Sequence, residues 1–295
     1  MEVKAFFDER TYTLTYIVWD ETTKDGVLID SVLDYDPIGS RIWTDSMKQH
    51  VDFIRDHSIH LHYILETHAH ADHLSASPFL KKIFPQAKIG IGSRIVEVQQ
   101  VFKEVFSLPD LIPNGSQFDI LLQDGEELQA GCLKVKVLHT PGHTPACVSY
   151  LIGDALFTGD ALFMPDYGVG RCDFPKGDPR ALYKSIQEKI YTLPDNTRVF
   201  VGHDYMPEGR PLKYESTIGE EKKFNIHLPA SRSEEEFVKI RTERDKTLAA
   251  PKLLYQSVMV NICGGGIPKA SENSRPYFKL PVNIQDRYGL LHQGS

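Results

Sequence analysis

Apolar and polar residues alternate along the first forty positions in the manner of β-strands. The segments "KAFFD" (residues 4–8), "TYTLTYIVWD" (11–20) and "GVLIDSVLDYD" (26–36) are the strands that this pattern predicts. Asp25-Gly26 lies between two of the apolar runs, which is typical of a tight hairpin turn. The chain is therefore expected to begin with antiparallel strands.

Helical spacing follows from residue 46. The stretch 46–57 places Met47, Val51 and Ile54 on one side, as an amphipathic helix does. Residues 60–66 form an apolar strand that leads directly into a cluster of histidines. After the cluster the pattern predicts a helix over 74–84, a short buried strand over 88–92, and a helix over 93–106 with Ser93 as its N-cap.

A second batch of strands is predicted between residues 118 and 162. A helix over 178–193 follows, with Asp178 as cap and Pro179 at its first position, and then a strand over 197–205. Strands in two batches, each followed by helices, favour an α+β fold in which two mixed sheets pack face to face with helices outside. The composition changes near residue 206, so we expect a catalytic core over 1–205. Residues 206–295 would be an extension that packs on the core and flanks the substrate cleft.

Composition limits the classes of function. Hydrophobic residues make up 41% of the chain and charged residues 25%, as in ordinary globular enzymes. The net charge of -7 and the absence of a basic block argue against a nucleic-acid partner. No apolar run is long enough to span a membrane, and the charged N-terminus does not resemble a secretory signal. The scattered cysteines predict reduced thiols in a cytoplasmic protein; they are Cys132, Cys147, Cys172 and Cys263.

The stretch "ETHAHADHL" (66–74) contains three imidazoles and two carboxylates within nine residues. Such a cluster can hold one metal ion, two or none, but its density on a turn has no economical explanation in packing alone. Imidazole and carboxylate ligands suit Zn, Fe or Mn, and the lack of cysteine argues against a purely structural zinc site. Further candidate ligands stand at the ends of other predicted strands: His143, Asp160 and His203. Four other histidines, His57, His60, His62 and His139, are better explained as structural.

The motifs "HAHADH", "TPGHT", "FTGD" and "VGHDY" together resemble those of the metallo-β-lactamase superfamily, in the right order from about residue 10 to 205. The resemblance implies an αββα sandwich. It also implies a set of metal ligands, which fall here on His68, His70 and His143 for a first metal and on Asp72, His73 and His203 for a second, with Asp160 between them.

Within that superfamily the chain is most similar to the persulfide dioxygenases and to bacterial β-lactamase-like hydrolases. The similarity lies in "ETHAHADHLSA", "GRCDFPKGD" and "VGHDYMPEGR", and extends to "EFVKIR" and "VNICGGG". It implies one Fe(II) per chain on His68, His143 and Asp160, with His70, Asp72, His73 and His203 orienting the ligands and tuning the iron. The implied reaction is oxidation of glutathione persulfide, or of a similar small persulfide, by O₂ to sulfite and thiol. A homodimer is implied as well.

The same resemblance implies substrate-binding residues. Arg171 matches a glutathione-contacting arginine, a residue type suited to a carboxylate fork, and Tyr205 matches a substrate-contacting tyrosine. We group Asp173, in the same loop as Arg171, with them. The animal-type enzymes have a second glutathione-binding arginine. At the matching place this chain has Asn225-Ile226-His227 instead. Candidate replacements are His227, Arg210, Arg241 and Arg244.

Two other functions stay open at this stage. A glyoxalase II-like thioesterase would use the same seven ligands, hold two Zn ions and hydrolyse glutathione thioesters. The loop "RCDF" after Asp160 favours the dioxygenase, because thioesterases of this kind tend to differ there. A non-catalytic thiol- or sulfur-binding protein is disfavoured, because a degenerate member of the family would be expected to have lost some ligands.

Overall fold

Two six-stranded sheets form the centre of the molecule in the computed structural model, which describes residues 1–269 and 275–282. The first sheet has the order β1-β2-β3-β6-β8-β9, antiparallel from β1 to β3 and parallel from β3 to β9. Its strands are β1 (Glu2–Asp8), β2 (Thr13–Trp19), β3 (Asp25–Ile29), β6 (His60–Glu66), β8 (Lys88–Gly92) and β9 (Ile120–Leu122).

The second sheet follows chain order from β10 to β15, and only β13 and β14 pair in parallel. Its strands are β10 (Glu127–Ala130), β11 (Leu133–His139), β12 (Val148–Ile152), β13 (Ala155–Phe157), β14 (Arg198–Phe200) and β15 (Glu215–Thr217). A small three-stranded sheet lies at one end and consists of β5 (Arg41–Trp43), β4 (Val32–Asp36) and β7 (Leu74–Ser75).

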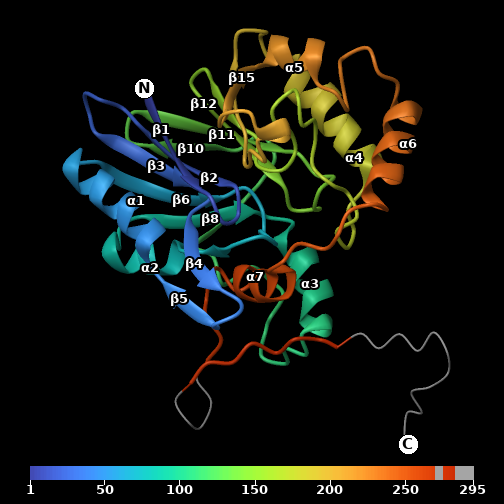
Figure 1. Ribbon diagram of the computed structural model, residues 1–295. Coiled ribbons are helices and arrows are strands. Elements are labelled where there is room, and N and C mark those ends of the chain that lie inside the picture. Colours follow the sequence, from blue (N-terminus) through green and yellow to red (C-terminus); the bar gives the residue numbers. More distant parts are fainter. Residues whose placement is uncertain (270–274, 283–295) are drawn as a thin grey trace, which may run out of the picture.

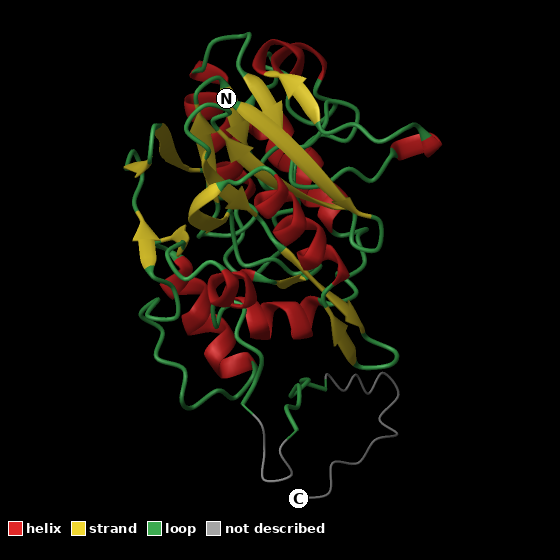
Figure 2. Ribbon diagram, turned by 90° about the vertical axis from the view of Figure 1, so that its left-hand side faces the viewer, coloured by secondary structure: helices red, strands yellow, loops and turns green. Residues whose placement is uncertain are grey.

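Helices lie outside both sheets (Figure 1). The helices α1 (Asp45–Asp56), α2 (Ser77–Ile83), α3 (Ile95–Val105) and α7 (Leu254–Asn261) share a hydrophobic cluster with the first sheet. The helices α4 (Pro179–Lys184), α5 (Ile218–Phe224) and α6 (Glu234–Asp245) pack on the second. Figure 2 is turned so that the α1 side faces the viewer, and helices lie there in front of strands. The predicted α+β sandwich of two mixed sheets is confirmed.

Strand β2 shows why the sandwich holds together. Its alternate residues Leu14, Tyr16 and Val18 point into the cluster between the sheets, whereas Ile17 and Trp19 join the cluster under the outer helices. The ring of Tyr16 packs edge-on against Phe157 of the second sheet at 5.1 Å. Both faces of β2 are thus buried.

The predicted hairpin between β2 and β3 is confirmed, but the position of its turn and the cap at Ser93 were predicted wrongly. The hairpin between β2 and β3 turns at residues 20–24, where the Asp20 carboxylate accepts the backbone N–H groups of Thr22 and Thr23. Gly26 lies inside β3, where a Cβ atom would come within 2.5 Å of Ile59 Cγ2, so close packing explains this glycine. Ser93 does not cap α3, because its N–H continues the sheet by donating to Leu122 O and the helix begins only at Ile95.

The helix predicted over 178–193 begins as expected, with the Asp178 side chain accepting from Arg180 N. It departs from α geometry after Lys184 and continues as a π turn (Ser185–Lys189) and a 3₁₀ turn (Ile190–Thr192). Another 3₁₀ turn, Pro207–Gly209, follows β14. No helix in the described part of the chain is long and apolar enough to cross a membrane.

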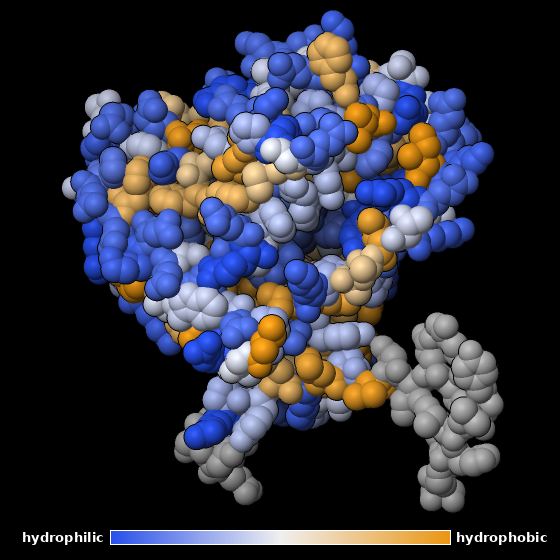
Figure 3. All heavy atoms as spheres, viewed as in Figure 1, coloured by the Kyte–Doolittle hydropathy of each residue, from blue (hydrophilic) through white to orange (hydrophobic). Residues whose placement is uncertain are grey.

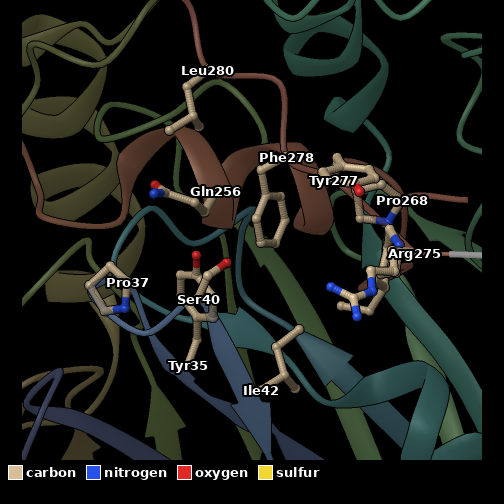
Figure 4. Close-up of a pocket in the computed structure, with 12 residues that line it drawn as sticks. Tyr35, Pro37, Ser40, Ile42, Gln256, Pro268, Arg275, Tyr277, Phe278 and Leu280 are labelled. Carbon is tan, nitrogen blue, oxygen red and sulfur yellow. The ribbon is translucent and has the colours of Figure 1, made fainter. Parts of the chain in front are cut away.

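Residues beyond 206 contribute to the same layers as those before it. Strand β15 pairs with β14, and Phe237 of α6 is fully buried in the cluster of the second sheet. The division into 1–205 and 206–295 stays a prediction. A cavity of about 610 Å³ lies between the β4–β5 hairpin, α7 and residues 275–280 (Figure 4). None of the residues that line it is a candidate metal ligand.

Candidate metal centre

The predicted ligands converge at one edge of the sandwich, because each follows a strand that ends there. The loop after β6 provides four of them, and the loops after β11, β13 and β14 provide one each. In the innermost group, Asp160 Oδ2 lies 3.6 Å from His143 Nε2 and 3.9 Å from His68 Nε2. These three side chains are close enough to share one metal ion.

A second group lies beside the first. Asp72 Oδ2 is 3.0 Å from His73 Nδ1 and 3.6 Å from His203 Nε2, and His70 belongs to the same cluster. The other oxygen of Asp160, Oδ1, lies 3.2 Å from His203 Nε2. Asp160 therefore stands between the two groups, as the family resemblance implied.

Hydrogen bonds fix which ring nitrogen faces the centre. The Nδ1–H of His143 donates to the carbonyl of Arg171 at 2.7 Å, and that of His203 donates to the carbonyl of Tyr12 at 3.2 Å. A carbonyl can only accept, so Nδ1 carries a proton in both rings and Nε2 is the atom that faces the centre.

His68 and His70 are oriented by one buried carboxylate, Asp30. Thr67 Oγ1 donates to Asp30 Oδ2 at 2.8 Å and so accepts from His68 Nδ1 at 2.9 Å. The ring of His70 is turned the other way, with Nε2 3.0 Å from Asp30 Oδ1 and 3.4 Å from Glu66 Oε2. Its Nδ1 is therefore the atom that a metal would use.

The buried charges are arranged to attract a cation. Burial alone would raise the pKa of Asp160, but the neighbouring His203, His68 and His143 outweigh it and lower that pKa. Burial likewise opposes the charged form of His203, yet Asp160 and Asp72 raise its pKa to about 9. Both carboxylates are thus held ionised at neutral pH.

Several buried polar atoms at the centre have no hydrogen-bond partner among the described residues. They are His70 Nδ1, His73 Nε2 and Asp160 Oδ1. Buried polar atoms are normally satisfied, and these three point to where a cation would be bound. The donor set of imidazoles and carboxylates fits a transition metal, with room for one ion or for two.

The model of the metallo-β-lactamase superfamily matches residues 9–203. The chain belongs to this superfamily. The matched residues include every candidate ligand, from His68 to His203.

Relatives with different names are similar in sequence to this chain. A probable metallo-hydrolase of Burkholderia pseudomallei is 44% identical, covering 96% of this chain and 99% of its own. A Dictyostelium discoideum protein named glyoxylase B2 is 43% identical, covering 96% and 97%. Human mitochondrial persulfide dioxygenase is 32% identical, covering 91% of both chains. Three further bacterial relatives, 43–45% identical, are longer, and the chain spans 64–65% of their length.

Among solved structures, the crystal structure of ETHE1 from Myxococcus xanthus superimposes with a TM-score of 0.72. It is 33% identical and covers 90% of this chain and all of its own. The similarity in sequence and the similarity in fold therefore point to the same superfamily.

The predicted substrate residues lie around the centre. Arg171 donates from Nε and Nη2 to the two oxygens of Asp173, each at 2.6 Å, and from Nη1 to the carbonyl of Ala249 at 2.8 Å. The two residues thus form a pair that fixes the loop after Asp160. The ring of Tyr205 stacks on the candidate ligand His203 at 5.5 Å and on Tyr167 at 4.7 Å, which makes an aromatic wall beside the candidate metal site.

The residues that could replace the second arginine differ in the hydrogen bonds and ion pairs that they make within the protein. His227 accepts the N–H of Val169 through Nδ1, and burial together with Arg241 and Arg244 lowers its pKa to about 4, so it is neutral at physiological pH. Arg210 is bound to Asp204 and Asp166. Arg241 is buried and bound to Asp245 and to the carbonyl of Val169.

Sequence reasoning missed two residues that shape the centre. Asp30 ends the apolar run "VLID", a common position for a site carboxylate, and that could have indicated it. Asn261 of α7 donates from Nδ2 to the carbonyls of His70 and His73 at 2.9 and 2.8 Å, and its Oδ1 accepts from Ser75 N. The only signal for it was an amide within the apolar run "VMVNIC".

Proposed function

We propose that the protein is a persulfide dioxygenase that binds one Fe(II) on His68, His143 and Asp160. The observation that supports this most directly is the grouping of two imidazoles and one carboxylate within reach of a single ion. Two histidines and a carboxylate leave open positions on the metal, which non-haem Fe(II) oxygenases use for substrate and O₂. The identity to a named persulfide dioxygenase over most of both chains supports the same assignment.

The proposed reaction converts glutathione persulfide, O₂ and water into glutathione and sulfite. The S–S bond breaks, the two sulfur atoms together lose four electrons and O₂ gains them; two sulfite oxygens come from O₂ and one from water. Bound iron would supply the redox chemistry that zinc lacks. The chain's own part is to fix the ligand rings through Arg171 O, Thr67 and Asp30, and to bound the site with Tyr205.

The second candidate is a thioesterase of the glyoxalase II kind with two Zn ions. The observation that favours it is the complete second group, in which His73 Nε2 and His70 Nδ1 are both unpartnered within the described chain. The relative named glyoxylase B2 supports the same reading. Two bound Zn ions would supply an activated water for hydrolysis of a glutathione thioester. Turnover of either substrate would exclude a non-catalytic binding role.

The deciding experiment is metal analysis of anaerobically purified protein together with oxygen uptake on addition of glutathione persulfide. We expect about one iron per chain, oxygen consumption and sulfite formation. His143→Ala should remove the iron and the activity. His139→Ala, a matched control outside the centre, should keep both. Two Zn per chain, no oxygen uptake and hydrolysis of a glutathione thioester would overturn the proposal in favour of the thioesterase. The homodimer and the cytoplasmic location stay predictions.

A further inference from the structure

The backbone that leads to the candidate ligand His143 is packed against helix α4. Gly142, directly before this histidine, has a φ of +147°, a conformation that L side chains rarely adopt. A Cβ atom at Gly142 would lie 2.3 Å from Leu182 Cβ and 2.5 Å from Leu182 Cα, so the helix could not come this close to any other residue type. The residue before the ligand is thus in contact with the helix backbone.

Three donors of the helical segment 178–192 contact carbonyls in the four residues before His143. They are the backbone N–H of Asp178 to Gly142 O at 2.8 Å, Ser185 Oγ to Pro141 O at 2.7 Å and Lys189 Nζ to His139 O at 2.9 Å. Ser185 is only 3% exposed, so water does not compete for its contact. Arg171 O orients the ring of His143, whereas these donors fix the main chain that carries the ring.

Side chains spaced four residues apart form three rows along this segment. The buried row packs into the core beside the second sheet and consists of Leu182, Ile186 and Ile190. The outward row consists of the exposed side chains Arg180, Lys184 and Glu188. Figure 3 shows a largely hydrophilic surface over the part of the molecule where α4 and α6 lie, as such a row requires. Ser185 and Lys189 form the third row, which faces the carbonyls before His143.

The π turn (Ser185–Lys189) keeps these rows straight. An α-helix has 3.6 residues per turn, so rows with a spacing of four would drift around its axis. The N–H of Ile190 donates to the carbonyl of Ser185, five residues back, so this turn holds an extra residue and offsets the drift. The same geometry buries Ile190 and brings Lys189 to His139 O. Such turns are rare and frequently lie at functional sites.

We propose that the segment 178–192 positions His143 for metal binding, with Ser185 as its central contact. Ser185 acts on the ligand through the main chain, so it is a positioning residue. The inference goes beyond the proposed function, because one Fe(II) and two Zn ions would use His143 alike. A loosened segment would let the imidazole move relative to His68 and Asp160, so both the affinity for a metal and the geometry of its coordination should change.

The test compares Ser185→Ala with Ser216→Ala in the full-length protein. Ser216 is a matched control, because it too is 3% exposed and its hydroxyl also donates one hydrogen bond, which goes to Glu221. Co(II) is the probe ion: competition with a chelator measures its affinity, and its visible absorption reports the coordination geometry. We expect the affinity to fall about tenfold and the absorption maximum to shift in Ser185→Ala. Ser216→Ala should change neither, and Ser185→Thr, which keeps the hydroxyl, should recover most of the affinity.

Lys189→Met tests the neighbouring contact of the same row, with the exposed Lys184→Met as control. Because Lys189 is partly exposed, the Co(II) affinity should fall by only about threefold. Wild-type Co(II) affinity and absorption in a folded Ser185→Ala protein, or a loss that Ser185→Thr does not recover, would overturn the inference. If Ser185→Ala does not fold, Lys189→Met decides: a loss of affinity supports the inference and an unchanged affinity overturns it. None of these readouts needs turnover, so the dioxygenase assignment can fail while the inference holds, and the reverse.

Discussion

The imidazole of His143 is hydrogen-bonded to the backbone of Arg171: His143 Nδ1 lies 2.7 Å from the Arg171 carbonyl oxygen. The guanidinium of the same residue is turned toward Asp173 and Ala249. One residue therefore orients a metal ligand with its main chain and fixes the loop with its side chain. Substitution can separate these two roles.

Arg171→Met should keep the metal content of the wild type, because the carbonyl that holds His143 remains. The loop loses its pair with Asp173, which is partly exposed, so we expect a loss of about 1 kcal/mol in the free energy of unfolding. Elemental analysis and urea denaturation measure the two quantities. A rise in KM with unchanged metal would place the guanidinium in substrate binding, whereas loss of metal would contradict the role assigned to the backbone.

Asp160→Ala should abolish metal binding, because its carboxylate faces both groups of ligands. The Asp72 carboxylate faces only the second group, so Asp72→Ala removes a carboxylate from that group alone. If one iron is bound on His68, His143 and Asp160, the Asp72→Ala protein should keep its metal; if two ions are bound, it should lose one. Elemental analysis of both variants, with the half-buried Asp36→Ala as control, decides between these cases. Full metal content in Asp160→Ala would contradict the site described above.

Asn261→Ala should weaken both the fold and the metal site. It removes two hydrogen bonds to the carbonyls of His70 and His73 and one from Ser75 N, all of them buried. At about 1 kcal/mol for each, the free energy of unfolding should fall by about 3 kcal/mol. Metal affinity should fall about tenfold, because the loop loses its support. Urea denaturation of the metal-free protein and metal competition test this, with the exposed Asn114→Ala as control. Unchanged metal affinity would show that the loop holds its geometry without α7.

Glu221 predicts a pH dependence of stability. It is fully buried, accepts hydrogen bonds from Ser216 and Asn225, and burial raises its pKa from 4.5 to about 8. Between those two values the folded chain keeps a proton that the unfolded chain has released, so this group makes stability fall as pH rises. The slope is at most about 1.4 kcal/mol per pH unit, and no further loss occurs above the folded-state pKa.

Glu221→Gln should remove this loss and be more stable than the wild type at pH 8, while the two proteins converge near pH 4.5. Urea denaturation at pH 5, 6.5 and 8 measures the difference, and the exposed Glu220→Gln is the adjacent control. A constant difference between variant and wild type across this range would contradict the raised pKa.

The amino-acid sequence by itself determined the fold and the chemical types at the metal centre. Apolar alternation predicted the two batches of strands, and His68, His143, Asp160 and His203 were found because each stands at the end of an apolar strand, a local signal. Local rules failed at Gly26 and Ser93, because contacts with Ile59 and with Leu122 decided those positions. In both cases tertiary packing outweighed a short-range preference.

Only the tertiary structure decided how the ligands are oriented and what surrounds them. The turned ring of His70, the support by Asn261 and the contact of Arg171 with Ala249 all depend on residues far apart in the chain. Hydrogen-bond geometry and burial are set by which loops the folded sheets bring together. A pattern of residue types contains no information about which ring nitrogen of a histidine faces a metal.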